Sequence, residues 1–157
     1  IGKRVLNKQL VPNGKLPVFS ANVNDPFGYI NEMLITDFSV PSVLWGIDGD
    51  WMTSYVPAEK PFYPTDHCGV LRCKTGEVNP RYLAHILQRE GTKAGFSRAY
   101  RASIGRVQRI SFNVPSIDKQ NVVISQVKSL EKKIDSANEK LKSLEGKIPE
   151  ILHKYLT

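Results

Sequence analysis

Hydrophobic residues in the last third of the chain recur at alternating intervals of three and four residues. This spacing predicts the apolar seam of a coiled coil, sustained for about four heptads. The positions expected to pair with another helix are Val127, Leu130, Ile134, Ala137, Leu141, Leu144, Ile148 and Ile151, and Tyr155 continues the spacing. We refer to these nine positions as the seam. Mixed charged residues lie between them, as expected for a solvated helix face.

The helix that would carry the seam is long. Ser116 occupies a suitable N-cap position, and a helix over residues 117–145 would extend about 43 Å at about 1.5 Å per residue. That length exceeds the diameter expected for a small domain, so we expect much of the seam to pack against another helix. A helix folded back along the preceding domain is the alternative. Gly146 and Pro149 predict a break or a kink near residues 146–149.

Short apolar runs separated by turn residues fill the middle of the chain and predict β-strands. The runs lie at 16–20, 34–35, 42–46, 51–56, 62–63 and 69–73, and partial alternation over 107–114 predicts a last strand that ends at Pro115. Asn79 followed by Pro80 predicts the start of a helix that Gly91 ends, with a loop over 92–105 behind it.

These patterns together predict an α+β protein with two parts. We expect a mixed, β-rich globular domain over residues 1–115 and a long C-terminal coiled-coil helix over residues 116–157. No apolar run approaches the roughly 18 residues of a membrane span. The chain begins with Ile1 and shows no leader, so we expect a piece of a longer protein without a secretion signal, working in the cytoplasm.

Positive charge is concentrated in one stretch of the chain. The formal net charge is +7, and residues 81–110 carry seven arginines and lysines against Glu90 alone, a net charge of +6. We call residues 81–110 the basic segment. Residues 17–80 have eight acidic and three basic residues, a net charge of −5. The distribution favours an anionic partner, such as nucleic acid, for the basic segment.

Two groups of residues are candidates for DNA contact. The first lies in the basic segment after the expected helix, among small residues that let the backbone approach a phosphate: Lys93, Arg98, Tyr100, Arg101 and Arg106. The second combines amide, hydroxyl and aromatic side chains suited to base edges: Ser20, Asn22, Asn24, Trp51, Ser54, Tyr55 and Lys60. A solvated basic loop, and ordinary loop chemistry with Trp51 in the core, are the alternatives.

Catalytic and metal sites are not predicted. Cys68 and Cys73, with His67, offer at most three metal ligands, so we expect two small side chains on a strand in a reducing compartment. The other two histidines are scattered, Asp48 and Asp50 fit a turn, and no glycine-rich cofactor loop follows a strand. We therefore expect no catalytic residue, no cofactor and no metal.

Seven motifs in order support a family resemblance. They are Gly14-Lys15-Leu16-Pro17-Val18-Phe19-Ser20, Phe27-Gly28-Tyr29-Ile30, Val43-Leu44-Trp45-Gly46-Ile47-Asp48-Gly49-Asp50, Phe62-Tyr63-Pro64-Thr65-Asp66-His67-Cys68-Gly69-Val70-Leu71, Asn79-Pro80-Arg81-Tyr82-Leu83, Ser103-Ile104-Gly105-Arg106-Val107-Gln108-Arg109-Ile110 and Val114-Pro115-Ser116-Ile117-Asp118-Lys119-Gln120. Over nearly the whole chain they resemble one half of a specificity subunit of type I restriction-modification systems, a target-recognition domain followed by its spacer helix. Lys119 departs from the acidic residue usual before the glutamine, and one recognition domain stands where two are usual.

The resemblance implies a non-catalytic module that recognises a specific sequence in double-stranded DNA and positions methyltransferase and restriction subunits. It also implies that the long helix pairs with a second recognition domain or with its own copy. The alternative function is a coiled-coil protein-interaction scaffold whose basic loop meets an acidic partner. The target bases, the orientation of the helix pair, and the choice between a natural half-subunit, a fragment and part of a fused enzyme stay open.

Overall fold

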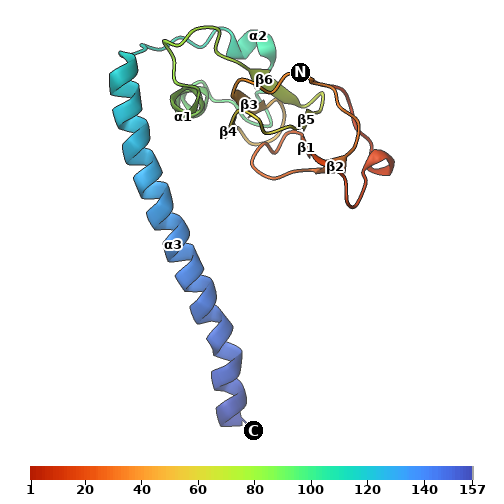
Figure 1. Cartoon of the computed structure of the whole chain (residues 1–157), viewed down its shortest axis with the longest axis vertical. Helices are drawn as coiled ribbons and strands as arrows, with labels where there is room; N and C mark the ends of the chain where they lie inside the picture. Colours follow the sequence, from red (N-terminus) through yellow and green to blue (C-terminus); the bar gives the residue numbers. More distant parts are fainter. Residues whose placement is uncertain (157) are drawn as a thin grey trace. The chain divides into compact units, whose positions relative to one another are not determined.

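The computed structural model describes residues 1–156, with side chains through Tyr155. Figure 1 shows small β-strands, shorter helical segments around them and one long C-terminal helix. The chain forms two compact units: a globular unit over Ile1–Gln120, and a helical arm that begins at Asn121. Mixed sheets followed by a long helix confirm the predicted α+β class.

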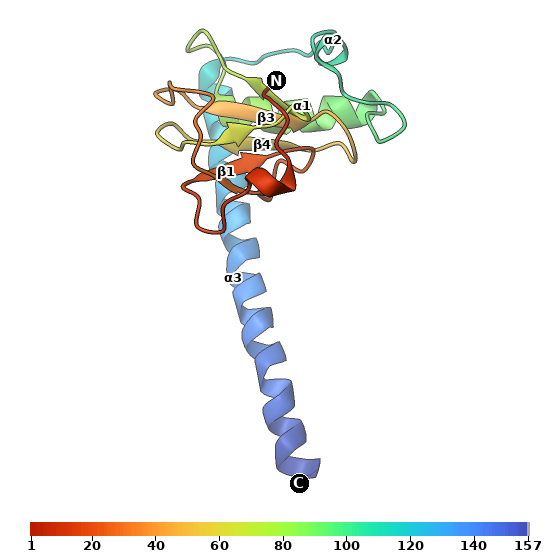
Figure 2. The same ribbon diagram turned by 90° about the vertical axis from the view of Figure 1, so that its right-hand side faces the viewer.

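Two three-stranded sheets form the centre of the globular unit. In one, β1 (Leu16–Phe19) pairs antiparallel with β2 (Gly28–Ile30) and parallel with β5 (Tyr63–Pro64). In the other, β3 (Ser42–Gly46) lies between β4 (Thr53–Val56) and β6 (Cys68–Leu71) and is antiparallel to both. Every residue of β3 is buried, as its uninterrupted apolar run predicts. Figure 2 shows β3 and β4 beside the first helix.

Helix α1 (Pro80–Lys93) covers one face of the β3–β4 pair. Its predicted start is confirmed, because the Asn79 side chain accepts hydrogen bonds from the amides of Arg81 and Tyr82 and Pro80 begins the first turn. Leu83, Ala84, Ile86 and Leu87 point into a core that they share with Val43 and Trp45. The helix ends at Lys93, two residues beyond the stop expected at Gly91. Gly91 does not end the helix; it lies inside it, where the absence of a side chain makes room for the ring of Trp51.

Two predicted strands are absent from the described residues. Residues 34–35 lie in an irregular loop, where Ile35 packs against the core and Asp37 accepts hydrogen bonds from the amide and hydroxyl of Ser39. Residues 104–107 form the short helix α2 (Ile104–Val107), and residues 110–116 have no regular secondary structure. The alternation of apolar residues over 107–114 arises because Ile110 and Phe112 pack against the core, and not because the segment is a strand of a sheet.

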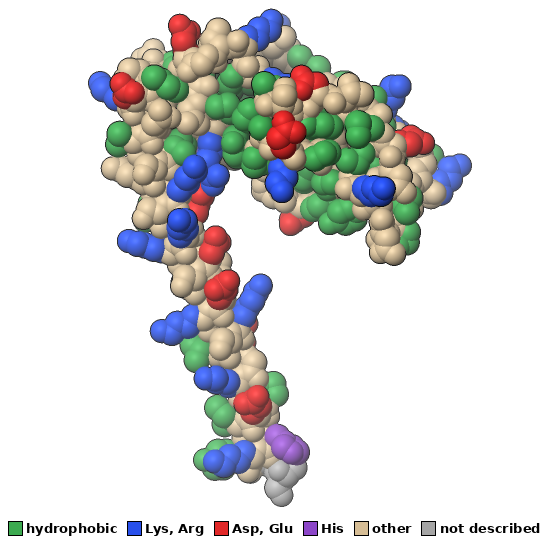
Figure 3. Space-filling view, viewed as in Figure 1, with side chains coloured by type: hydrophobic (Ala, Val, Ile, Leu, Met, Phe, Trp, Pro, Cys, Tyr) green, Lys and Arg blue, Asp and Glu red, His purple; other side chains and the backbone are tan. Residues whose placement is uncertain are grey.

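Helix α3 runs without interruption over Ile117–Leu156, so the predicted break near residues 146–149 is wrong. Pro149 removes one backbone hydrogen bond and lies within the last two turns of the helix, where few bonds follow it. The seam is exposed along the arm: Leu130, Ile134, Leu141, Leu144, Ile148 and Ile151 each keep 52–58% of their surface. Figure 3 shows hydrophobic side chains between charged ones along its lower half.

The first turn of α3 is fixed to the globular unit by Gln120, which is completely buried. Its side-chain oxygen accepts a hydrogen bond of 2.8 Å from the amide of Asn79, and its side-chain nitrogen donates to the carbonyls of Glu77 and Pro115 at 2.8 Å each. Through these bonds the start of α3 is held beside the start of α1. Within residues 1–156 no helix is long and apolar enough to cross a membrane.

Candidate nucleic-acid interface

The loop that follows α1 is anchored to the end of β3. The amide of Ala102 donates to the carbonyl of Ile47 at 3.1 Å, and the indole nitrogen of Trp45 donates to the carbonyl of Ala102 at 2.9 Å. Ala102 is buried, and Gly69 leaves room for the Trp45 ring that reaches it. We call residues 97–103 the anchored loop. Its backbone is therefore held by the core, although it has no regular secondary structure.

An ion pair adds a side-chain anchor next to this backbone anchor. Arg101 approaches both carboxylate oxygens of Asp48: Nη2 donates to Oδ2 at 2.8 Å, and Nε contacts Oδ1. Asp48 lies in the turn that follows β3, and its carboxylate is only 26% exposed. The fork of the guanidinium matches the two oxygens, which makes this a bidentate pair.

His67 extends the ion pair toward the N-terminus. Its Nδ1 contacts Oδ2 of Asp48, and its Nε2 lies 3.3 Å from Nη2 of Arg4. Arg4 in turn pairs with Asp66, with 3.2 Å between Nε and Oδ2. Because an arginine only donates, Nε2 of His67 accepts here, and the proton on Nδ1 is donated to Asp48. Asp48 thus holds two partners from distant parts of the sequence.

Three aromatic rings pack in a row next to the anchored loop. Trp51 meets Phe96 edge to face with 5.1 Å between ring centroids, and Phe96 stacks on Tyr100 at 5.7 Å. The guanidinium of Arg106 lies 4.1 Å above the Tyr100 ring, and its Nη1 donates to the carbonyl of Arg101 at 2.8 Å. The row fixes Arg106 by a cation–π contact and a hydrogen bond.

Two pockets border the anchored loop. The first, of about 360 Å³, is lined by Glu90, Lys93, Ala94, Phe96, Tyr100, Arg106, Arg109, Ile110 and Ser111. We call it the cationic pocket, since three basic residues face one acid. Hydrogen bonds from Lys93 and Arg89 hold the pKa of the Glu90 carboxyl below its usual value, so this acid stays charged and paired. The net positive charge suits a phosphate group.

The second pocket, of about 480 Å³, is lined by Ser20, Ala21, Asp48, Gly49, His67 and Arg98. We call it the mixed pocket because it combines a hydroxyl, an imidazole and a guanidinium with a carboxylate. The Ser20 hydroxyl lies 3.1 Å from that of Thr65, which fixes its place at the end of β1. Donors and acceptors together suit the edge of a base better than a phosphate.

The structure brings some of the predicted DNA contacts together. Lys93, Tyr100 and Arg106 share the cationic pocket, whereas Ser20 and Arg98, which come from the two separate predicted groups, share the mixed pocket. Arg101 lies between them on Asp48. Sequence reasoning missed the roles of Asp48, His67 and Arg109. Asp48 was read as a turn residue, and no sequence spacing connects it with Arg101, 53 residues away.

The remaining predicted contacts lie elsewhere. Trp51 packs in the core and donates its indole hydrogen to the carbonyl of Gln88, and Tyr55 packs against the same core beneath Arg81. Asn22 accepts hydrogen bonds from the amides of its own turn, and Asn24 contacts the sulfur of Met52. Ser54 lies within β4, and Lys60 is exposed in the loop after β4. None of these six side chains lines either pocket.

The cysteines and acids do not form a metal site in the part of the chain that the structure describes, which contains no group of three metal-ligating side chains. Cys68 is buried in β6, where burial raises the pKa of its thiol to about 12, and burial also raises the pKa of Cys73. Neither thiol is poised to act as a nucleophile at neutral pH.

Comparison with known proteins identifies relatives over nearly the whole chain. A family model described as "Type I restriction modification DNA specificity domain" matches residues 1–146. Two Mycoplasma pneumoniae proteins are named as type I specificity subunits. The first, named as an N-terminus, is 32% identical over a stretch that covers 57% of this chain and 49% of its own length. The second is 29% identical over a stretch that covers 80% of this chain and 35% of its own length.

A solved structure shares the fold. The crystal structure of the S subunit of a type I restriction-modification system from M. genitalium matches with a TM-score of 0.63 and 19% identity, covering 91% of this chain and 38% of that chain. The present chain thus spans half or less of the length of each of these relatives.

Proposed function

This chain belongs to the family of type I restriction modification DNA specificity domains, and we propose on that premise that it recognises a specific sequence in double-stranded DNA. One observation carries the proposal: a cationic pocket and a mixed pocket border the same anchored loop. Such a loop offers phosphate contacts on one side and base contacts on the other, which are the two kinds of contact that sequence recognition requires.

The cationic pocket supports the phosphate contacts. Lys93, Arg106 and Arg109 converge on it, and Arg106 is already oriented by Tyr100 and by the carbonyl of Arg101. Contacts of this kind position a protein on DNA without reading its sequence, and their strength falls as salt rises, because bound counterions are released.

The mixed pocket supports the base contacts. Arg98 offers a planar fork suited to the acceptors of guanine, and the Ser20 hydroxyl donates or accepts. Asp48 is less suited to contact DNA directly, because Arg101 and His67 occupy its oxygens.

We also propose that the chain carries out no chemistry of its own and works in the cytoplasm. In this proposal methyltransferase and restriction subunits supply methylation and cleavage, and the seam of α3 pairs with a second recognition domain or with a second copy. The exposed seam supports the pairing, because large apolar side chains at heptad positions are stabilised by a facing helix.

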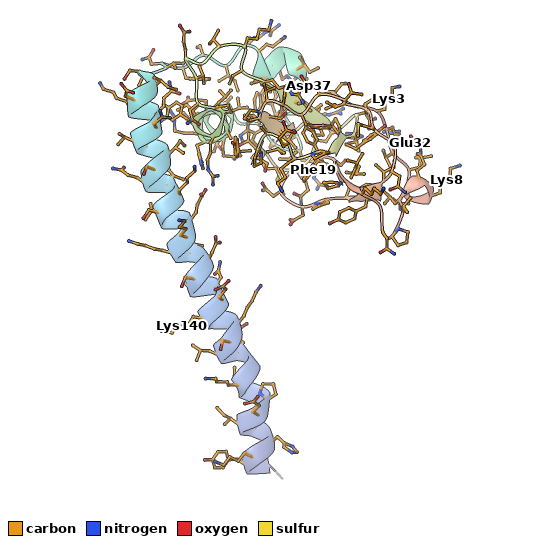
Figure 4. The ribbon with its side chains drawn as sticks, viewed as in Figure 1. Lys3, Lys8, Phe19, Glu32, Asp37 and Lys140 are labelled. Atoms are coloured by element: carbon orange, nitrogen blue, oxygen red, sulfur yellow. The ribbon has the colours of Figure 1, made fainter. Side chains whose placement is uncertain are left out.

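A fluorescence anisotropy titration with a mixed-sequence duplex over a salt series tests the proposal. We expect salt-sensitive binding, and we expect Arg106→Ala to weaken it about equally for all sequences and to reduce the salt slope by about 1. Lys8→Ala, which removes the same charge from the N-terminal 3-10 helix η1 (Asn7–Gln9; Figure 4), is the matched control and should leave the slope unchanged.

Absence of binding at low salt, with or without partner subunits, would contradict DNA recognition. An Arg106→Ala titration indistinguishable from the Lys8→Ala titration would remove the cationic pocket from the interface. The second candidate, a coiled-coil scaffold for an acidic protein partner, is favoured by the exposed seam and predicts stable pairing without retention of duplex DNA.

A further inference from the structure

We propose that Asp48 is a positioning residue for DNA recognition, and that Arg101 acts through Asp48 on the anchored loop instead of contacting DNA. The inference rests on the proposed function, whose interface it refines. It assigns a role to the acidic residue of the mixed pocket, and it removes from the set of DNA contacts an arginine that composition alone would place there.

The geometry of the Arg101–Asp48 pair is the first argument. Two nitrogens of Arg101 face the two oxygens of Asp48, so this fork is already occupied by an internal carboxylate. A guanidinium that contacts a phosphate or a guanine edge uses the same bidentate geometry, and it would have to leave Asp48 to do so. Arg101 is therefore poorly placed for either kind of contact, whereas Arg98 and Arg106 line pockets.

The bonds around the pair give the second argument, since they connect Asp48 to a proposed DNA contact. Arg101 is followed by Ala102. The amide of Ala102 donates to the carbonyl of Ile47 at the end of β3, and its carbonyl accepts from the indole nitrogen of Trp45. The carbonyl of Arg101 accepts a hydrogen bond of 2.8 Å from Nη1 of Arg106. Orientation thus passes from Asp48 through Arg101 to the guanidinium of Arg106 in the cationic pocket.

His67 provides the third argument by holding the carboxylate from a second side. Its Nδ1 contacts the same Oδ2 that accepts from Arg101, and it reaches this position from the loop before β6. A carboxylate with two partners has less rotational freedom than one with a single partner. It is consequently a firmer support for a loop without regular secondary structure.

The size of the effect follows from exposure. The Arg101 side chain is 56% exposed, so the pair adds little to the global stability of the domain, in the range of other surface ion pairs. Its loss should act locally, on the order of the loop and on DNA affinity. This separation between local order and global stability makes the positioning role measurable.

Removing a negative charge from a DNA-binding surface ordinarily strengthens binding, because phosphate repulsion falls. A positioning role predicts the opposite sign for Asp48. Asp50 is the matched control, since it lies two residues further on in the same turn, is exposed, and carries the same charge. Both substitutions remove one negative charge, but only Asp48→Asn removes the carboxylate that pairs with Arg101.

The experiment compares Asp48→Asn, Asp50→Asn, Arg101→Gln and the Asp48→Asn/Arg101→Gln double variant of the full chain. Affinity for a preferred and a scrambled duplex is measured over a salt series, and amide hydrogen exchange of residues 97–103 is measured without DNA. We expect Asp48→Asn to weaken binding to the preferred duplex roughly threefold to tenfold and to lower the preference for it, with an unchanged melting temperature. Asp50→Asn should bind equally well or more tightly.

Hydrogen exchange in the anchored loop should become faster in Asp48→Asn and Arg101→Gln alike, and the double variant should add little to either. Tighter binding by Asp48→Asn, matching Asp50→Asn, would overturn the inference. So would an Arg101→Gln variant whose salt slope falls by about 1 from that of the unaltered chain while hydrogen exchange in the anchored loop stays unchanged, because that result marks a direct phosphate contact.

Failure of the proposed function is distinguishable from failure of this inference. If the unaltered chain binds no duplex, DNA recognition fails, and hydrogen exchange still decides whether Asp48 supports the loop. Unchanged exchange in both single variants would overturn the positioning role, whatever the affinity for DNA.

Discussion

The anchored loop and the seam of α3 differ in where their partners lie. Charged side chains in and beside the anchored loop are held within the same unit: Arg101 of the loop pairs with Asp48, and Arg106, just after the loop, contacts the Tyr100 ring and the carbonyl of Arg101. In the seam, six leucine and isoleucine side chains keep more than half of their surface exposed. One proposed interface is therefore formed by the fold of the globular unit itself, whereas the other exposes apolar side chains that a facing helix would bury.

The free energy of burying the seam side chains explains why a facing helix would matter. Full burial of a leucine or isoleucine side chain contributes about 1.5–3 kcal/mol, and an isolated helix without packing is marginal in water. A facing helix would therefore stabilise the arm greatly. The anchored loop needs no such partner to keep its conformation.

The largest change in assembly is expected from a substitution within the seam. Leu144→Asp places a charge at an interior seam position, where burial of an unpaired carboxylate opposes pairing, so self-association or pairing with a second domain should weaken more than about a hundredfold. Sedimentation analysis of the full chain checks the assembly, and circular dichroism over a concentration series checks the helix content.

The control introduces the same charge one residue away. Ser143 is exposed and lies off the seam, so Ser143→Asp should leave assembly unchanged within a factor of about two. Equal loss of assembly in both variants would show that helix propensity or net charge, and not the seam, determines pairing. Unchanged assembly in Leu144→Asp would contradict the seam altogether.

The second prediction concerns Gln120, which lies at the boundary between the globular unit and the helical arm. Gln120→Met keeps the side-chain volume but leaves the amide of Asn79 and the carbonyls of Glu77 and Pro115 without this partner. We expect a loss of about 2–3 kcal/mol in the free energy of unfolding of the globular unit. Urea denaturation followed by the fluorescence of Trp45 and Trp51, both in that unit, measures it.

Gln108→Met is the matched control, since Gln108 is exposed just after α2 and its substitution should change stability by less than about 0.5 kcal/mol. A similar midpoint for Gln120→Met and the unaltered chain would show that water replaces the lost bonds. Gln120 would then not determine where the globular unit ends.

Much of the fold could be predicted from local patterns. The Asn79 cap, the buried run of β3 and the long C-terminal helix each depend on residues close in sequence, and the structure confirms all three. The last strand and the helix break were predicted wrongly. Alternation around Ile110 shows which side is buried but not whether a neighbouring strand exists, and one proline near a helix end costs too little to decide its course.

The candidate site was less accessible to sequence reasoning than the fold. Residue type and charge indicated Arg98, Arg106 and the basic segment, because these properties are local. The pairing of Arg101 with Asp48 depends on the β3 turn meeting a loop 53 residues later, which only the tertiary fold supplies. Trp51 and Tyr55 carry the chemistry of a DNA contact, yet α1 covers them, and burial of this kind has no local signature.

The last prediction distinguishes the two pockets that border the anchored loop. Arg98→Ala should lower the preference for the recognised duplex over a scrambled one by about 1 kcal/mol, or about fivefold, because a base contact in the mixed pocket is lost. Lys93→Ala, which removes the same charge from the cationic pocket, should weaken binding to both duplexes equally and reduce the salt slope by about 0.9. Paired titrations at two salt concentrations measure both quantities. If Arg98→Ala weakens both duplexes equally, the mixed pocket contributes only phosphate contacts, and base recognition must reside in another surface of the globular unit.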